Sequence, residues 1–143
     1  MAGNKTLARE WFEEVWNGRS SEAITRRMAP DCLVHGLDQG GQDLRGPAAF
    51  APFHQAFLGA FSDLHIEVED VIEEGDRVAV RWTATGRNDG DTLGFPATHQ
   101  TMRIGGMTIA RIANGQLVEG WNTFDALAML QQLGALPPPP AKW

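Results

Sequence analysis

The spacing of apolar residues along the first thirty positions predicts two helices. Apolar side chains recur at helical spacing between residues 7 and 16, with charged side chains on the opposite side. A second, shorter helix is expected after the capping candidates Ser20 and Ser21. We expect it to bury Met28 and to end before Pro30, because the residue before a proline disfavours the helical conformation.

A short strand, a loop and a third helix are predicted next. Residues 32–35 form the strand candidate, and the glycine-rich stretch 36–46 is typical of a loop. The third helix begins at Pro47 and carries four phenylalanines along one side (Phe50, Phe53, Phe57 and Phe61). Pro52 lies inside this helix, where its missing N–H is expected to cause a kink.

From residue 64 the apolar period falls to two, which predicts antiparallel strands. The alternation breaks before Val71, which suggests a bulge, and residues 74–76 form a hairpin turn to a strand at 78–85. After a loop, a long strand at 100–112 is interrupted by Gly105-Gly106, a second expected bulge or bend.

The last elements are a returning strand and a short helix. Asn114-Gly115 predicts a hairpin turn into a strand at 116–122, and a helix is expected over about 125–133. This order of elements predicts an α+β fold, in which a cone-shaped, curved antiparallel (mixed) sheet wraps around N-terminal helices and encloses an apolar pocket. We expect one domain over 1–136 and a proline-rich tail over 137–143.

Composition and charge exclude several classes of partner. The net charge of −6 argues against a nucleic-acid-binding surface, which needs clustered Lys and Arg. No apolar run is long enough to span a bilayer and no signal sequence is evident, so we expect no membrane partner and a cytoplasmic location. The only cysteine, Cys32, excludes an internal disulfide, and the histidines lack zinc-ligand spacing, so no metal is expected.

Several segments carry a family resemblance. They are residues 44–47 (LRGP), 61–64 (FSDL), 90–98 (GDTLGFPAT), 114–121 (NGQLVEGW) and 130–134 (LQQLG). With the order of elements, they resemble the SnoaL-like polyketide cyclases of the nuclear-transport-factor-two-like superfamily. The resemblance implies a cone fold and acid/base chemistry without a cofactor, of the cyclase, aldol or isomerase type, on an apolar substrate that bears a carbonyl group.

The resemblance also marks where this chain departs from the family. The position of the cyclases' acid/base aspartate holds Asn122, three residues before Asp125, and the position of a frequent loop histidine holds Asn88. An asparagine accepts no proton near neutral pH, but it can donate a hydrogen bond to an oxyanion. We therefore assign His35 as the base, Asp125 as its orienting partner and Asn122 as the donor to the oxyanion.

A wide apolar wall is expected to bind the substrate. The candidates are Phe53, Phe57, Trp82, Met102, Met107 and Trp121, joined by Asn88 and by His99, which is expected at the pocket rim or in solvent.

Two other functions stay open at this point, and the sequence also predicts how the chain assembles. The chain could be a binding protein for apolar small molecules without catalysis, or an epoxide hydrolase, although the Arg and Asp pair of that enzyme would fall near Arg81 and Thr83. Apolar or small residues on both faces of the long strands predict a homodimer through the outer face of the sheet.

Overall fold

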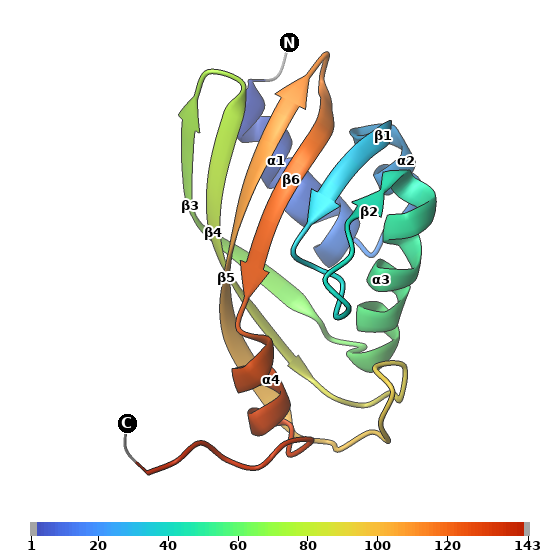
Figure 1. The fold of residues 1–143 in the computed structure, drawn as a ribbon, viewed down its shortest axis with the longest axis vertical. Coiled ribbons are helices and arrows are strands. Elements are labelled where there is room, and N and C mark those ends of the chain that lie inside the picture. The colour runs from blue at the N-terminus through green and yellow to red at the C-terminus, as the bar shows by residue number, and fades with distance from the viewer. Residues whose placement is uncertain (1–2, 142–143) are drawn as a thin grey trace.

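A computed structural model describes residues 3–141 of the chain, drawn in Figure 1. The elements in chain order are α1 (Asn4–Trp11), η1 (Phe12–Asn17), α2 (Ser21–Arg27), β1 (Met28–His35), β2 (Leu44–Arg45), α3 (Gly46–Ala60), β3 (His65–Glu74), β4 (Arg77–Arg87), β5 (Thr101–Ala113), β6 (Gln116–Phe124) and α4 (Ala126–Gln132). Residues 142–143 of the expected tail lie outside the described residues.

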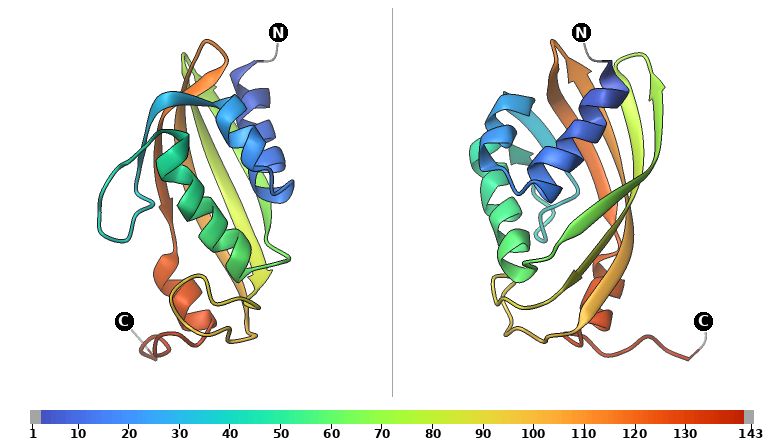
Figure 2. Two further views of the ribbon diagram at one scale, coloured as in Figure 1. Left: turned by 90° about the vertical axis from the view of Figure 1, so that its right-hand side faces the viewer. Right: turned by 180° about the vertical axis from the view of Figure 1, so that it is seen from behind.

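The strands form one mixed sheet of six strands in the order β2-β1-β6-β5-β4-β3. Strands β1 and β6 are parallel, and every other neighbouring pair is antiparallel. Figure 2 shows the sheet curving around α1, α2 and α3, which cover its concave side. The predicted α+β cone with a curved mixed sheet is confirmed.

The N-terminal helices form as expected but end differently. Ser20 caps α2, because its hydroxyl accepts a hydrogen bond from the backbone N–H of Ala23 at 3.1 Å. The first helix changes to a π-helical turn at Phe12, which the periodicity did not predict. The prediction that Met28 belongs to the second helix was wrong: the helix ends at Arg27, and Met28 begins β1 in extended conformation.

The loop and the third helix also differ in detail from the expectation. The predicted loop 36–46 contains the two-residue strand β2, which pairs with β1. Helix α3 runs from Gly46 to Ala60 without a break at Pro52, whose side chain is exposed.

Of the two irregularities predicted in the long strands, one is a bulge and the other is not. The register of β3 against β4 shifts between Val68 and Asp70, which confirms a bulge near the break in alternation. The register of β4 against β5 is unbroken through Gly105 and Gly106, so no bulge interrupts that pair. Gly106 instead makes room for an indole, because a Cβ there would lie 2.2 Å from the ring of Trp82.

The core lies between the concave face of the sheet and the helices. Alternate residues of β4, among them Val78, Val80 and Trp82, point to this side and are buried. No helix in residues 3–141 is long and apolar enough to cross a membrane.

Candidate functional site

An internal cavity of about 100 Å³ lies between the concave face of the sheet and the helices. Its lining comes from every helix except α2 and α4 and from every strand except β2. The described lining residues are Ala8, Trp11, Phe12, Trp16, Met28, Cys32, Val34, Leu37, Phe50, Phe53, Phe57, Leu64, Ile66, Val80, Trp82, Ala84, Met102, Ile104, Thr108, Ala110, Leu117, Glu119, Gly120, Asn122 and Phe124. The wall is therefore almost wholly apolar, as expected for a site that encloses an apolar molecule.

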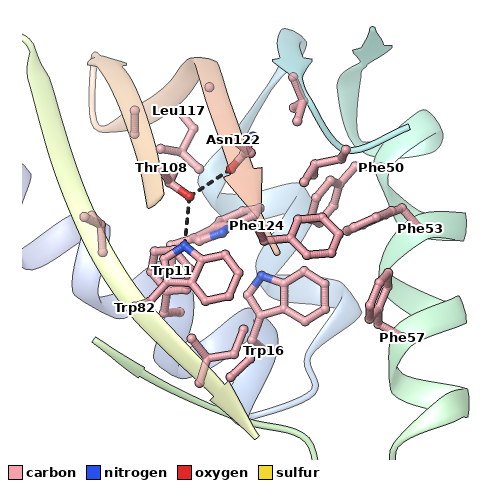
Figure 3. A pocket seen from close by; sticks show the side chains of 18 of the residues that line it. Trp11, Trp16, Phe50, Phe53, Phe57, Trp82, Thr108, Leu117, Asn122 and Phe124 are labelled. Carbon is pink, nitrogen blue, oxygen red and sulfur yellow. Dashed lines mark hydrogen bonds between the residues drawn. The ribbon is translucent and has the colours of Figure 1, made fainter. Parts of the chain in front are cut away.

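Aromatic rings from α1, η1, α3, β4 and β6 surround the cavity (Figure 3). Trp16, in the π-helical turn η1, meets Phe53 of α3 edge to face, with ring centroids 6.1 Å apart. Phe57 of α3 meets Phe124 of β6 in the same way at 6.0 Å. Phe53, Phe57 and Phe124 are only half-buried, whereas Trp16 is buried.

A chain of hydrogen bonds crosses the polar part of the wall. The Nε1–H of Trp82 donates to the hydroxyl of Thr108 at 3.1 Å, and that hydroxyl donates to Oδ1 of Asn122 at 2.9 Å. The Nδ2 of Asn122 donates to the main-chain oxygen of His35 at 3.0 Å. Asn122, the position of the family aspartate, therefore lines the cavity with an amide that is held at both ends.

The side chain of His35 is not part of the described lining. Its ring stacks on Trp121, and its two nitrogens lie 2.8 Å from Oδ1 of Asp43 and 2.7 Å from Oε2 of Glu119. The hydrogen bonds to Glu119 and then Asp43 raise the pKa of His35, and the bond to His35 lowers the pKa of Glu119. A histidine oriented by carboxylates thus exists, but its partners are Glu119 and Asp43.

Asp125 and Asn88 make contacts within the backbone framework. Asp125 caps α4, since its Oδ1 accepts from the N–H of Ala128 at 3.0 Å. Asn88 is fully buried, donates to the main-chain oxygens of Ala60 and Gly90, and accepts from the N–H of Thr98. The bonds of Asn88 fix the loop after β4. Neither Asp125 nor Asn88 is part of the described cavity lining.

The other predicted substrate-binding residues divide between the two faces of the sheet. Phe53, Phe57, Trp82 and Met102 line the cavity. Met107 is 56% exposed on the outer side, Trp121 stacks on His35 there, and His99 is exposed in the loop before β5.

Sequence reasoning missed several lining residues. Trp11, Trp16 and Phe50 were recognised only as the apolar sides of helices, and Phe124 and Thr108 were not singled out. The available signal was strand alternation: Thr108 and Asn122 are directly paired across β5 and β6, so their side chains share a face.

Two titratable residues, Cys32 and Glu119, belong to the lining among the described residues. The carboxylate of Glu119 bonds to His35 and Arg111 on the outer side of the sheet. Burial raises the pKa of the Cys32 thiol to about 11, so this side chain is a neutral thiol near pH 7. No cluster of three or more potential metal-ligating side chains occurs in the part of the chain that the structure describes.

The family model of the SnoaL-like polyketide cyclases matches residues 6–133. The chain belongs to the SnoaL-like polyketide cyclase family. One relative in this family is the aklanonic acid methyl ester cyclase DnrD of Streptomyces peucetius, which is 28% identical over 131 residues, 91% of this chain and 90% of DnrD. The family supports a cyclase function without a cofactor and the binding of a small-molecule substrate.

Solved SnoaL-like structures share the fold over nearly the whole chain. AclR of Streptomyces galilaeus, named as a proposed hydroxylase, matches with a TM-score of 0.83 and 28% identity, covering 96% of this chain and 84% of AclR. A proposed SnoaL-like polyketide cyclase from Jannaschia sp. CCS1 matches with a TM-score of 0.82 and 25% identity, covering 96% and 99%. The names attached to this one fold thus cover more than one reaction.

Proposed function

We propose that this SnoaL-like protein is a cofactor-independent enzyme that encloses a flat, apolar molecule bearing carbonyl groups and promotes enolate chemistry on it, such as an aldol-type ring closure. The observation that carries the proposal is the amide of Asn122, which lines an otherwise apolar aromatic cavity and is held in place by Thr108 and the main chain of His35. The name of the relative DnrD, a cyclase of a methyl ester, supports a carbonyl-bearing substrate.

The reaction we propose needs no oxidant or reductant. A base removes a proton from a carbon beside a carbonyl group, and the electron pair moves to the oxygen to form an enolate. The enolate carbon attacks a second carbonyl carbon of the same molecule, and the resulting alkoxide takes up a proton, so the product is an isomer of the substrate. An N–H of Asn122 donates to the enolate oxygen, and the aromatic walls hold the two carbons close together.

For the proton transfer we propose Glu119, with His35 and Arg111 holding its carboxylate. Glu119 is a residue of the cavity lining, and its two carboxylate oxygens lie 2.7 Å from the His35 ring and 3.3 Å from the Arg111 guanidinium on the outer side of the sheet. Proton transfer therefore requires the carboxylate to leave these partners and turn toward the cavity. These contacts lower the pKa of Glu119, which makes it a weak base. Such a base suits a substrate whose carbon lies between two carbonyl groups and is already acidic.

A panel of cyclisation, isomerisation and retro-aldol substrates tests this function. We expect Asn122→Ala and Glu119→Gln to lower kcat by about 100-fold each, the usual effect of losing an oxyanion donor or an acid/base group. His35→Ala should lower kcat less, and His65→Ala, the loss of an exposed histidine on β3, serves as its control. Asp125→Ala should lower stability without changing kcat if Asp125 only caps α4, whereas a lower kcat would indicate a role in turnover. Unchanged turnover in the Asn122, Glu119 and His35 variants would overturn the assignment.

The second candidate function is that of a binding protein for apolar small molecules. It is favoured by the lining itself, whose titratable residues among those described are a neutral thiol and a weakly basic carboxylate that His35 and Arg111 hold on the outer side of the sheet. It predicts thermal stabilisation by apolar compounds without turnover of any of them. An epoxide hydrolase finds less support, because Arg81 is exposed and pairs with Asp70 at 2.7 Å away from the cavity lining.

We further propose that the protein is a homodimer that pairs through the outer face of the sheet. On this face Met107 and Ile109 are 56% and 44% exposed. Among the arginines of this face, Arg81 and Arg111 are paired with Asp70 and Glu119 within the chain, so these two do not oppose an apolar contact. Sedimentation equilibrium at micromolar concentration should give twice the 15.6 kDa of one chain, and the mass of one chain would refute the dimer.

A further inference from the structure

The hydrogen bonds from Trp82 to His35 can run in only one direction. An indole N–H is a donor and never an acceptor, and a main-chain carbonyl oxygen is an acceptor and never a donor. Since Trp82 donates into Thr108 at one end and His35 accepts from Asn122 at the other, the Thr108 hydroxyl must donate to Asn122. The assignment of oxygen and nitrogen in the Asn122 amide follows from chemistry at both ends.

This direction decides which group of the amide is left for a ligand. The Thr108 hydroxyl takes one of the two lone pairs of Oδ1 in Asn122 and holds that oxygen toward β5, and the His35 oxygen takes one of the two Nδ2 hydrogens. The second N–H has no partner among the described residues. A cavity ligand that reaches the Nδ2 end of Asn122 therefore meets a donor, which suits a carbonyl or enolate oxygen.

Trp82, the first residue in this series of hydrogen bonds, is itself fixed in place. The ring of Trp82 lies directly over Gly106, where any Cβ would be only 2.2 Å away, and Thr108 follows two residues later on the same strand. Trp82 therefore presents its N–H to Thr108 from a packed ring, and the Thr108 hydroxyl uses a lone pair to accept it. The hydroxyl hydrogen is then left for Asn122.

We propose that Thr108 is a positioning residue: through its hydrogen bonds to Trp82 and Asn122 it keeps the amide turned so that an N–H faces the ligand. The site then selects apolar molecules that present an acceptor oxygen over equally shaped molecules that do not. This inference rests on the proposed role of Asn122 as a donor and adds the residue that enforces it.

Binding of 9-fluorenone and fluorene, two flat tricyclic probes that differ by one carbonyl oxygen, tests the proposal. In the unaltered protein we expect fluorenone to bind about fivefold more tightly than fluorene by calorimetry, the usual worth of one hydrogen bond. The infrared carbonyl stretch of bound fluorenone should also shift to lower frequency than in an apolar solvent. Thr108→Val keeps the shape of the side chain without its hydroxyl, and should reduce both the preference and the shift. Thr108→Ser should restore them.

The variants separate the failure of this inference from the failure of the proposed function. If Thr108→Val keeps the full preference and frequency shift, Thr108 does not position the amide, and the inference is overturned. If the unaltered protein shows neither effect, or if Asn122→Ala keeps both, Asn122 is not the donor and the proposed function fails with it. Equal fluorene affinity in all variants confirms that the cavity is intact, and a changed infrared shift cannot arise from a loss of stability alone.

Discussion

The side-chain amide of Asn122 donates to the main-chain oxygen of His35 at 3.0 Å, and this bond ties the end of β1 to its parallel neighbour β6. The residue that follows β1, Gly36, lies so close to β6 that a Cβ there would be 1.9 Å from the main-chain oxygen of Asn122. Asn122 is thus a structural link between two strands as well as part of the cavity wall.

Restoring the family's aspartate at this position should destabilise the protein. In Asn122→Asp a carboxylate oxygen would face the His35 oxygen, and two acceptors cannot bond each other. We expect a loss of about 2 kcal/mol in the free energy of unfolding at pH 7, measured with urea. The loss should be smaller at pH 4, where a protonated carboxyl can donate again. An equal loss at both pH values would contradict the bond's assigned direction.

The adjacent glycines of β5 should differ sharply in their tolerance of a methyl group. Gly106→Ala forces the ring of Trp82 to move and costs about 1 to 3 kcal/mol of stability through overpacking. Gly105→Ala is the matched control, because the nearest atom to its Cβ is the Trp82 oxygen at 3.9 Å. Urea unfolding of both variants, with the near-ultraviolet circular dichroism of the tryptophans, measures the difference. Equal stability would contradict the packing of Trp82 on Gly106.

The His35 cluster should make stability depend on pH. Glu119 and then Asp43 raise the pKa of His35 above 6.5, so its stabilisation is complete below pH 6.5 and is lost as pH rises through the raised value. The pKa of Glu119 is lowered below 4.5, mainly by His35, so its contribution is present above pH 4.5 and is lost as pH falls through the lowered value. The contribution of this pair is therefore greatest between these limits.

Thermal unfolding from pH 4 to 9 checks this dependence with a single variant. His35→Gln removes the titrating ring and should flatten the decline in Tm above pH 6.5. Arg111 also contacts Glu119, at 3.3 Å, so in this variant the Glu119 carboxylate still has a cationic partner. An unchanged decline would show that another group causes it.

The thiol of Cys32 should be protected from alkylation. Its pKa is raised to about 11 by burial, so at pH 8 the thiolate fraction is about 100-fold lower than for a cysteine with a pKa near 9. Iodoacetamide labelling followed by mass spectrometry should therefore be at least that much slower in the folded protein than in urea. Fast labelling of the folded protein would show that the cavity wall opens to solvent.

The sequence predicted the fold well because its strongest signals are local. Alternation in β3 and β4, the hairpin at Asn114-Gly115 and the cap at Ser20 depend on near neighbours in the chain. The position of Met28 was wrong because an apolar residue after a helix suits either a last helical turn or the first residue of a strand. Only the pairing of Met28 with Leu117 on β6 decides between them.

The site was harder to predict because it depends on which face of the sheet each residue occupies. Met102 and Met107 were both expected at the cavity, but they differ by an odd number of positions on one strand, so only Met102 points inward. His35 follows the inward-facing Val34 and therefore faces outward, where Glu119 meets it across a parallel strand pair. That partner is distant in sequence, whereas Asp125 was suggested by its spacing from Asn122.

Hydrogen exchange at a carbon acid tests the central claim, enolate stabilisation by Asn122, without requiring the natural substrate. The probe is 2-tetralone, an apolar bicyclic ketone, whose proton exchange in deuterated water is followed by nuclear magnetic resonance at saturating protein. We expect the protein to accelerate exchange beside the carbonyl, and Asn122→Ala to lower that acceleration by about 100-fold. Exchange at the buffer rate while the ketone is demonstrably bound would contradict catalysis and leave a binding protein.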